Sequence, residues 1–160
     1  MNKYPLVFLL FSAFICAEQT LNTPYGSLTI TNNQATRDWF SQSYIFADKV
    51  IGYSEWMDVK AQNLGGLEGK DYIVLMASTG GNHCQDVVSF IEVGADNVRF
   101  SPSFDVCSGL DKVRLVDNTV VLTELEVEGV TAVQFITLDN ELFNGSSADY
   151  QENYSFLRTD

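Results

Sequence analysis

The middle of the chain carries the run Asp71-Tyr72-Ile73-Val74-Leu75-Met76-Ala77, which is hydrophobic from its second residue onward. A strand with one buried face alternates apolar and polar side chains, whereas a strand buried on both faces is apolar throughout. The run therefore predicts a central strand that is covered on both sides.

Segments with a period of two lie on both sides of this run, and helical periodicity is nearly absent. The predicted strands cover residues 27–31, 43–46, 50–53, 56–60, 71–77, 86–93, 98–100, 112–116, 119–123 and 132–136. Turn pairs such as Asn32-Asn33 and Asp117-Asn118 separate them, and no long repeat recurs. We expect an all-β fold, an antiparallel meander that forms a small sandwich or barrel.

Length and charge limit the class of protein. The chain has 160 residues, 46% of them hydrophobic, so one domain with a packed core is expected rather than global disorder. It carries 21 Asp and Glu against 9 Lys and Arg, a formal net charge of −12. Nucleic acid and anionic membrane surfaces are recognised by clustered cations, so the composition argues against both as partners.

The N-terminus has the layout of a secretory signal peptide. Lys3 precedes an apolar stretch that ends at Ala17 and is too short to span a bilayer. We expect a signal peptide over 1–17, a single β domain over 18–143 and a polar tail over 144–160 in which Tyr154-Ser155-Phe156-Leu157 docks as a strand. The protein is then exported, to the periplasm first of all, without membrane insertion after cleavage. The alternatives are an extracellular protein and a lipid anchor at Cys16.

Removal of the signal peptide leaves Cys84 and Cys107. An even pair in an oxidising compartment predicts a disulfide. The alternative is a reactive thiol at Cys84 beside His83, which would leave Cys107 without a partner.

Two segments around these cysteines resemble a family of small exported bacterial β-domains. The carrying motifs are Gly80-Gly81-Asn82-x-Cys84 and Ser101-Pro102-x-Phe104-x-x-Cys107, together with Thr23-Pro24-Tyr25-Gly26 upstream, and the likeness spans residues 23–125. The family is uncharacterised, so the resemblance implies the compartment and the fold but no activity. Asp105 stands where the family pattern has a glycine.

Two groups of residues are candidate partner-binding sites. The glycine-rich loop offers Gly80, Gly81, Asn82 and His83, and the sequence Glu124-Leu125-Glu126-Val127-Glu128 places three carboxylates on one face if it forms a strand. Three carboxylates spaced along one strand do not converge on a cation, so we expect no metal site and no cofactor. No motif pairs His83 with a nucleophile, so no catalytic residue is assigned.

These features favour an acidic protein-binding module that recognises a cationic envelope protein. An inhibitor or immunity-type protein against a basic envelope-active enzyme fits the size, compartment and charge, and opposite charge accelerates association. The alternatives are a hydrolase that uses carboxylates brought together by the fold and an envelope accessory domain with no tight ligand. The sequence does not indicate an oligomeric state.

Overall fold

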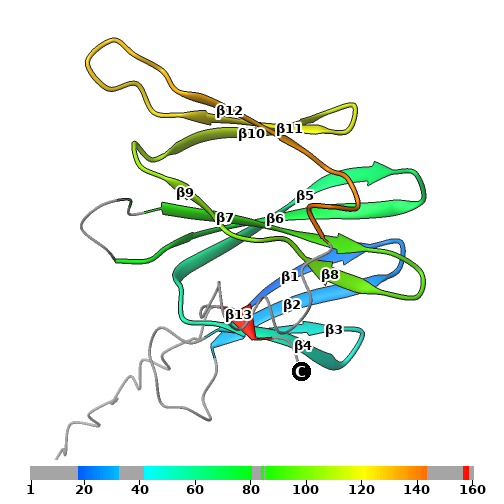
Figure 1. The fold of residues 1–160 in the computed structure, drawn as a ribbon. Helices are drawn as coiled ribbons and strands as arrows, with labels where there is room; N and C mark the ends of the chain where they lie inside the picture. The colour runs from blue at the N-terminus through cyan, green and yellow to red at the C-terminus, as the bar shows by residue number, and fades with distance from the viewer. Residues whose placement is uncertain (1–17, 33–41, 81–83, 85, 144–156, 159–160) are drawn as a thin grey trace, which may run out of the picture.

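The computed structural model describes residues 18–32, 42–80, 84, 86–143 and 157–158. These residues form thirteen strands in three antiparallel sheets and no helix (Figure 1). The predicted all-β class is confirmed. The expected signal peptide and all of the expected tail except Leu157 and Arg158 lie outside the described residues.

The N-terminal sheet has the order β1-β2-β3-β4-β13. Its strands are β1 (Gln19–Thr23), β2 (Gly26–Asn32), β3 (Gln42–Phe46), β4 (Lys49–Ser54) and β13 (Leu157–Arg158). A two-residue turn joins β3 to β4, and both of its residues, Ala47 and Asp48, have positive φ, as hairpin turns that follow the strand twist require. β1 was not predicted. β13 pairs with Tyr53 and Ser54, so the chain returns to this sheet near its C-terminus.

The central sheet runs β5-β6-β7, and β8 and β9 share the far edge of β7. Its strands are β5 (Met57–Leu67), β6 (Lys70–Ser78), β7 (Asp86–Val93), β8 (Val98–Phe100) and β9 (Phe104–Val106). β5 continues past the predicted end at residue 60, because the Gly65-Gly66 pair is accommodated by a register shift after Asn63 rather than by a turn.

The segment Ser101-Pro102-Ser103 interrupts what would otherwise be one long strand along β7. The Ser101 amide donates to the Phe90 carbonyl at 2.8 Å, and the Ser101 hydroxyl accepts from the Phe90 amide at 2.9 Å. Pro102 has no N–H to offer a sheet, so β8 and β9 are separate. The sequence pattern therefore did not predict β9 as a strand.

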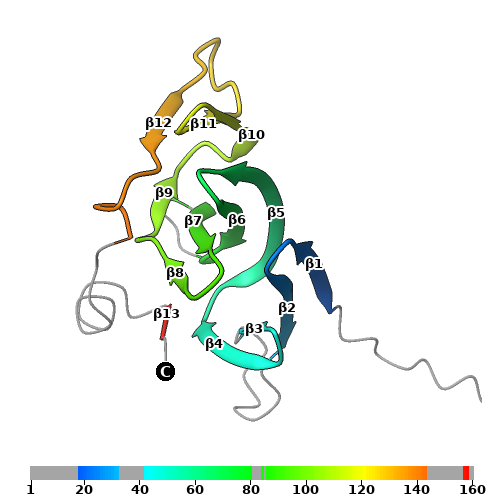
Figure 2. The same ribbon diagram turned by 90° about the vertical axis from the view of Figure 1, so that its right-hand side faces the viewer.

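The C-terminal sheet contains β10 (Leu110–Val116), β11 (Thr119–Glu124) and β12 (Val133–Thr137), in that order. The three sheets stack in layers, with the central sheet in the middle (Figures 1 and 2). The described sheets do not close into a barrel, so of the two predicted architectures the molecule has stacked sheets, with one layer more than a simple sandwich.

β6 lies between two hydrophobic cores. Ile73, Leu75 and Ala77 pack in the first core, between the N-terminal and central sheets. Tyr72 and Val74 pack in the second core, between the central and C-terminal sheets. Each large apolar side chain buried in this way contributes roughly 1.5–3 kcal/mol. The prediction of a central strand covered on both faces is confirmed, and two cores explain why its sequence does not alternate.

Candidate functional site

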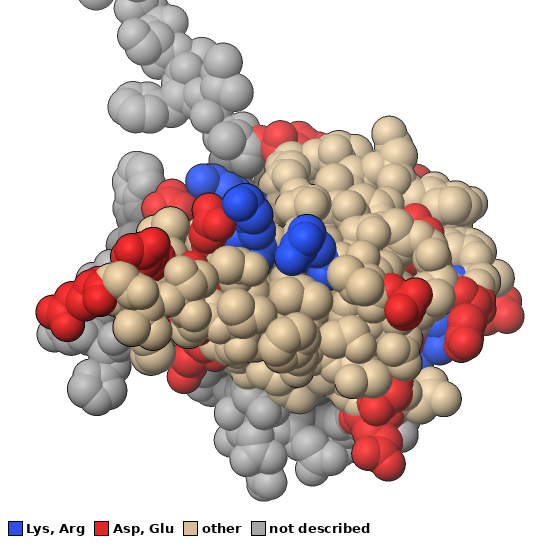
Figure 3. All heavy atoms as spheres, turned by 90° about the horizontal axis from the view of Figure 1, so that it is seen from above, with Lys and Arg blue, Asp and Glu red and all other residues tan. Residues whose placement is uncertain are grey.

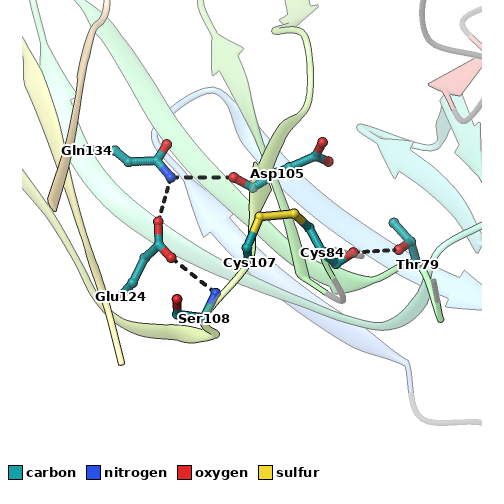
Figure 4. Close-up of a disulfide and its surroundings, with 7 residues drawn as sticks. All are labelled: Thr79, Cys84, Asp105, Cys107, Ser108, Glu124 and Gln134. Atoms are coloured by element: carbon teal, nitrogen blue, oxygen red, sulfur yellow. Dashed lines mark hydrogen bonds between the residues drawn. A yellow bond between two sulfur atoms is a disulfide. The ribbon is translucent and has the colours of Figure 1, made fainter. Parts of the chain in front are cut away.

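Cys84 and Cys107 form the predicted disulfide. The bond joins the segment before β7 to the residue after β9, next to one end of the central sheet (Figure 4). Disulfides persist in oxidising compartments, so the bond indicates a location outside the cytoplasm. No helix in the described part of the chain is long and apolar enough to cross a membrane.

Only the first residue of the candidate glycine-rich loop is described. Gly80 is exposed and has a φ of +67°, and a Cβ added there would meet the Cε atom of Met57. The Thr79 hydroxyl donates to the Cys84 carbonyl at 3.3 Å. Gly81, Asn82 and His83 lie outside the described residues, so their role in partner binding stays a prediction.

The three candidate carboxylates do not share one strand face. Glu124 ends β11 and is only 6% exposed, whereas Glu126 and Glu128 are exposed in the connection between β11 and β12. The strand ends at Glu124 because the chain then enters a tight hairpin, in which Val127 pairs with Val130 and Glu128 has positive φ. An alternating sequence alone does not reveal such a hairpin.

The buried Glu124 carboxylate ties the C-terminal sheet to the disulfide segment (Figure 4). It accepts hydrogen bonds from the Ser108 amide at 3.1 Å and from the Gln134 side chain at 2.7 Å. The same Gln134 amide reaches the Asp105 carbonyl at 3.4 Å. Glu124 is therefore a structural residue, and only Glu126 and Glu128 remain as candidates for steering a partner.

A second buried carboxylate, Glu92 on β7, was missed by the sequence analysis. It is 1% exposed and forms ion pairs with Lys70, at 2.9 Å, and with Arg99. Burial alone would raise the pKa of Glu92, but hydrogen bonds from Lys70 and Arg99 outweigh it and lower the pKa. The available signal was a charged residue inside the apolar stretch Phe90-Ile91-Glu92-Val93.

The surroundings of Glu92 keep it ionised and fully hydrogen-bonded. The Tyr72 hydroxyl donates to it at 3.2 Å, and burial together with the Glu92 charge raises the pKa of Tyr72 to about 12. The Arg99 guanidinium lies over the Phe143 ring, 5.4 Å from its centroid. Through Arg99, the fully hydrogen-bonded Glu92 carboxylate holds the segment near Phe143 in place. Because it is ionised, it has no proton to give and is not arranged as a general acid.

Exposed apolar side chains are concentrated on the C-terminal sheet and its hairpin. Six of the seven large exposed apolar side chains among the described residues form this apolar surface: Val116, Leu125, Val127, Val130, Val133 and Phe135. Phe135 is 72% exposed, because β12 alternates and directs Gln134 and Ile136 inward. Figure 3 shows this side of the molecule, where a broad uncharged area is bordered by both acidic and basic side chains.

A cleft of about 550 Å³ lies between the central sheet and β10. It is lined by parts of β5, β6, β7 and β10, and its charged residues are Asp58, Lys60, Asp86, Asp111, Lys112 and Arg114. Among the described residues, no three His, Cys, Asp or Glu side chains are grouped so that they could hold a metal ion. The cleft therefore offers separate charges of both signs for binding.

Comparison with known proteins gives no matching family model, no similar curated protein and no similar solved structure.

Proposed function

We propose that the protein is an exported protein-binding module that uses the apolar surface of its C-terminal sheet. One observation carries the proposal: six of the seven large exposed apolar side chains of the described residues lie on the C-terminal sheet and on the hairpin between β11 and β12. Exposed apolar side chains concentrated on one part of a surface are typical of protein–protein contact sites, and an exposed aromatic ring is a common anchor. Phe135 fills that role on this sheet.

The charge of the molecule supports a cationic partner. The formal net charge is −12, and the exposed carboxylates of Glu126 and Glu128 stand in the hairpin that carries Leu125, Val127 and Val130. Apolar side chains beside the carboxylates of this hairpin fit a partner that has Lys or Arg next to an apolar patch, because opposite charges speed association and disfavour other partners. A basic enzyme that acts in the periplasm, inhibited by this protein, has those properties.

The test is a capture experiment with matched variants of the oxidised protein. Wild-type protein, a Val133→Thr/Phe135→Ser variant and a Val50→Thr control are immobilised and exposed to envelope extract. Val50 is also exposed but lies on β4, in a different sheet. We expect one basic protein to be retained by wild type and the control, to be lost from the apolar-surface variant and to elute as salt rises.

Retention that is equal on all three proteins would show that the apolar surface is not the contact site. If no protein is retained by the wild type at low salt, the binding function itself is rejected. Inhibition is measured separately. The activity of the captured enzyme should fall when wild-type protein is added and should not fall when the Val133→Thr/Phe135→Ser variant is added.

A further inference from the structure

The cleft is bordered by the free edge of β10. Five consecutive residues of this strand, 110–114, line the cleft, although successive side chains of a strand point to opposite faces. A wall made of consecutive residues is the edge of a strand, where backbone groups are presented. β10 is the terminal strand of its sheet and pairs only with β11 among the described residues. Its outer backbone N–H and C=O groups therefore border the cleft.

The floor of the cleft is the part of the central sheet that the C-terminal sheet leaves uncovered. On β5, Val59 and Ala61 pack in the first core, so Asp58, Lys60 and Gln62 point to the other side and are exposed. Further along β5, Leu64 and Leu67 are packed against the second core. A strand added to the edge of β10 would lie above the first half of β5 and extend the C-terminal sheet over it.

Acidic and basic side chains follow one another along the cleft. Asp86 lies at one end of the cleft. It pairs across the central sheet with Ser78, which in turn pairs with Met57, and it lies beside Gly109, the residue before β10. Asp58 and Asp111 belong to this end by their positions in β5 and β10. Lys60 lies two residues further along the sheet, opposite Met76, and Lys112 and Arg114 follow along β10. In Figure 3, several basic side chains lie together beside the uncharged area.

These charges are largely available to a ligand. The single ion pair among them in the described structure is Asp111 with Lys112, at 3.5 Å, and both side chains of that pair are exposed. Lys60 and Arg114 form no ion pair with a described residue, nor do Asp58 and Asp86. A ligand with one charge of each sign can therefore neutralise both ends.

From this geometry we infer that the cleft binds an extended peptide, which adds a strand to the free edge of β10 and places an acidic side chain near Lys60 and a basic side chain near Asp86. Addition of a strand to an exposed sheet edge is a recurrent mode of peptide recognition, in which backbone hydrogen bonds give affinity and side chains give specificity. In the antiparallel orientation the acidic residue precedes the basic one. Residues four apart lie on the same face, about 13–14 Å from each other, which is the span of the β10 segment 110–114 that lines the cleft.

The probe is a labelled peptide, acetyl-Thr-Glu-Val-Thr-Val-Lys-Thr-amide, compared with the same peptide in which Glu and Lys exchange places. Binding to the oxidised full chain is measured by fluorescence anisotropy at low salt. We expect the first peptide to bind at least about tenfold more tightly than its isomer, because the isomer brings like charges together at both ends. N-methylation of the central Thr, which removes a backbone donor, should abolish the binding.

Two variants locate the site. Lys60→Glu should weaken binding of the first peptide about fivefold or more. The same variant should prefer a peptide in which Lys replaces the Glu. Lys49→Glu, an exposed change of the same type on β4, should have no such effect. The Phe135→Ser variant should bind the peptides as wild type does, because the inference does not depend on the proposed apolar surface.

Three outcomes would overturn the inference. One is the absence of binding up to about 1 mM peptide, the range of the weakest specific complexes. Another is equal binding of the two isomers. The third is a dimer, seen by sedimentation, that Lys60→Glu dissociates, since a second copy would then be the occupant of the edge.

Discussion

The side-chain amide of Gln134 on β12 donates to the Glu124 carboxylate on β11 at 2.7 Å, inside the C-terminal sheet. The other oxygen of Glu124 accepts from the Ser108 amide, next to the disulfide-bonded Cys107. One carboxylate thus connects the sheet that bears the proposed binding surface to the segment that the disulfide holds. Because both oxygens accept hydrogen bonds from groups within the protein, the carboxylate has a structural role.

Glu124→Leu should lower the free energy of unfolding by about 2–3 kcal/mol, since it leaves the Ser108 amide and the Gln134 side chain without their acceptor. Urea denaturation monitored by tryptophan fluorescence measures the change. Glu126→Leu is the matched control, because Glu126 is exposed and its replacement should alter stability by no more than about 0.5 kcal/mol. Similar losses for the two variants would contradict the structural role of Glu124.

Loss of the disulfide should weaken the fold without abolishing it. The Cys84→Ser/Cys107→Ser variant frees a loop whose ends are 23 residues apart in sequence, and the chain-entropy model predicts a loss of about 3 kcal/mol. The midpoint of urea denaturation for the variant, compared with that of the oxidised and reduced wild type, gives the value. The variant and the reduced wild type should agree. If the variant is as stable as the oxidised protein, the bond contributes no stability.

The sequence was sufficient for the parts of the fold that depend on local periodicity. The run 71–77 predicted β6 and its burial on both faces, and the pair Cys84–Cys107 followed from counting cysteines. The sequence was not sufficient where a strand continues through a register shift or is divided by a short irregular segment. Gly65-Gly66 resembles a turn but is accommodated within β5, and Ser101 bridges β8 and β9 by hydrogen bonds to Phe90, a residue eleven positions earlier.

The candidate sites were harder to predict because they depend on which side chains the sheets cover. Glu124 and Glu126 are equivalent in an alternating pattern, but the hairpin after β11 buries the first and exposes the second. Phe135 looks like a core residue in the strand 132–136, and only the position of β12 over the second core directs it outward. The cleft arises from sheet stacking, which no local pattern encodes.

Gly80 and Gly69 offer a test of how much strain comes from the backbone alone. Both have positive φ, +67° and +75°, but a Cβ at Gly69 would meet nothing within 4 Å, whereas one at Gly80 would meet Met57. Each change to Ala should cost about 1–2 kcal/mol from the left-handed conformation. Gly80→Ala should cost only slightly more than Gly69→Ala, because the end of the flexible Met57 side chain can move, and this difference should disappear when Met57 is also changed to Ala. Urea denaturation of all variants at one pH measures these differences in the free energy of unfolding. A difference that persists in the Met57→Ala background would exclude this contact as its cause.

Glu92 should make stability depend on pH. Its pKa in the folded protein is lowered by Lys70 and Arg99, so the native state binds a proton less readily than the unfolded chain does. The stabilisation is therefore fully present above the ordinary glutamate pKa of about 4.3 and is lost as the pH falls through the lower folded value. Unfolding free energies of wild type measured between pH 7 and pH 3 should decrease toward acid.

Other carboxylates also titrate in this range, and Glu92→Gln isolates the contribution of Glu92. At pH 7 this variant should be less stable by about 2–3 kcal/mol, because Lys70 and Arg99 lose their anionic partner. The difference in unfolding free energy between wild type and this variant should decrease as the pH falls. In wild type Glu92 becomes protonated and loses its charge, whereas the variant has no charge there to lose. Glu68→Gln, an exposed control, should run parallel to wild type. A gap for Glu92→Gln that stays constant from pH 7 to pH 3 would mean that the ionisation of Glu92 is not coupled to folding.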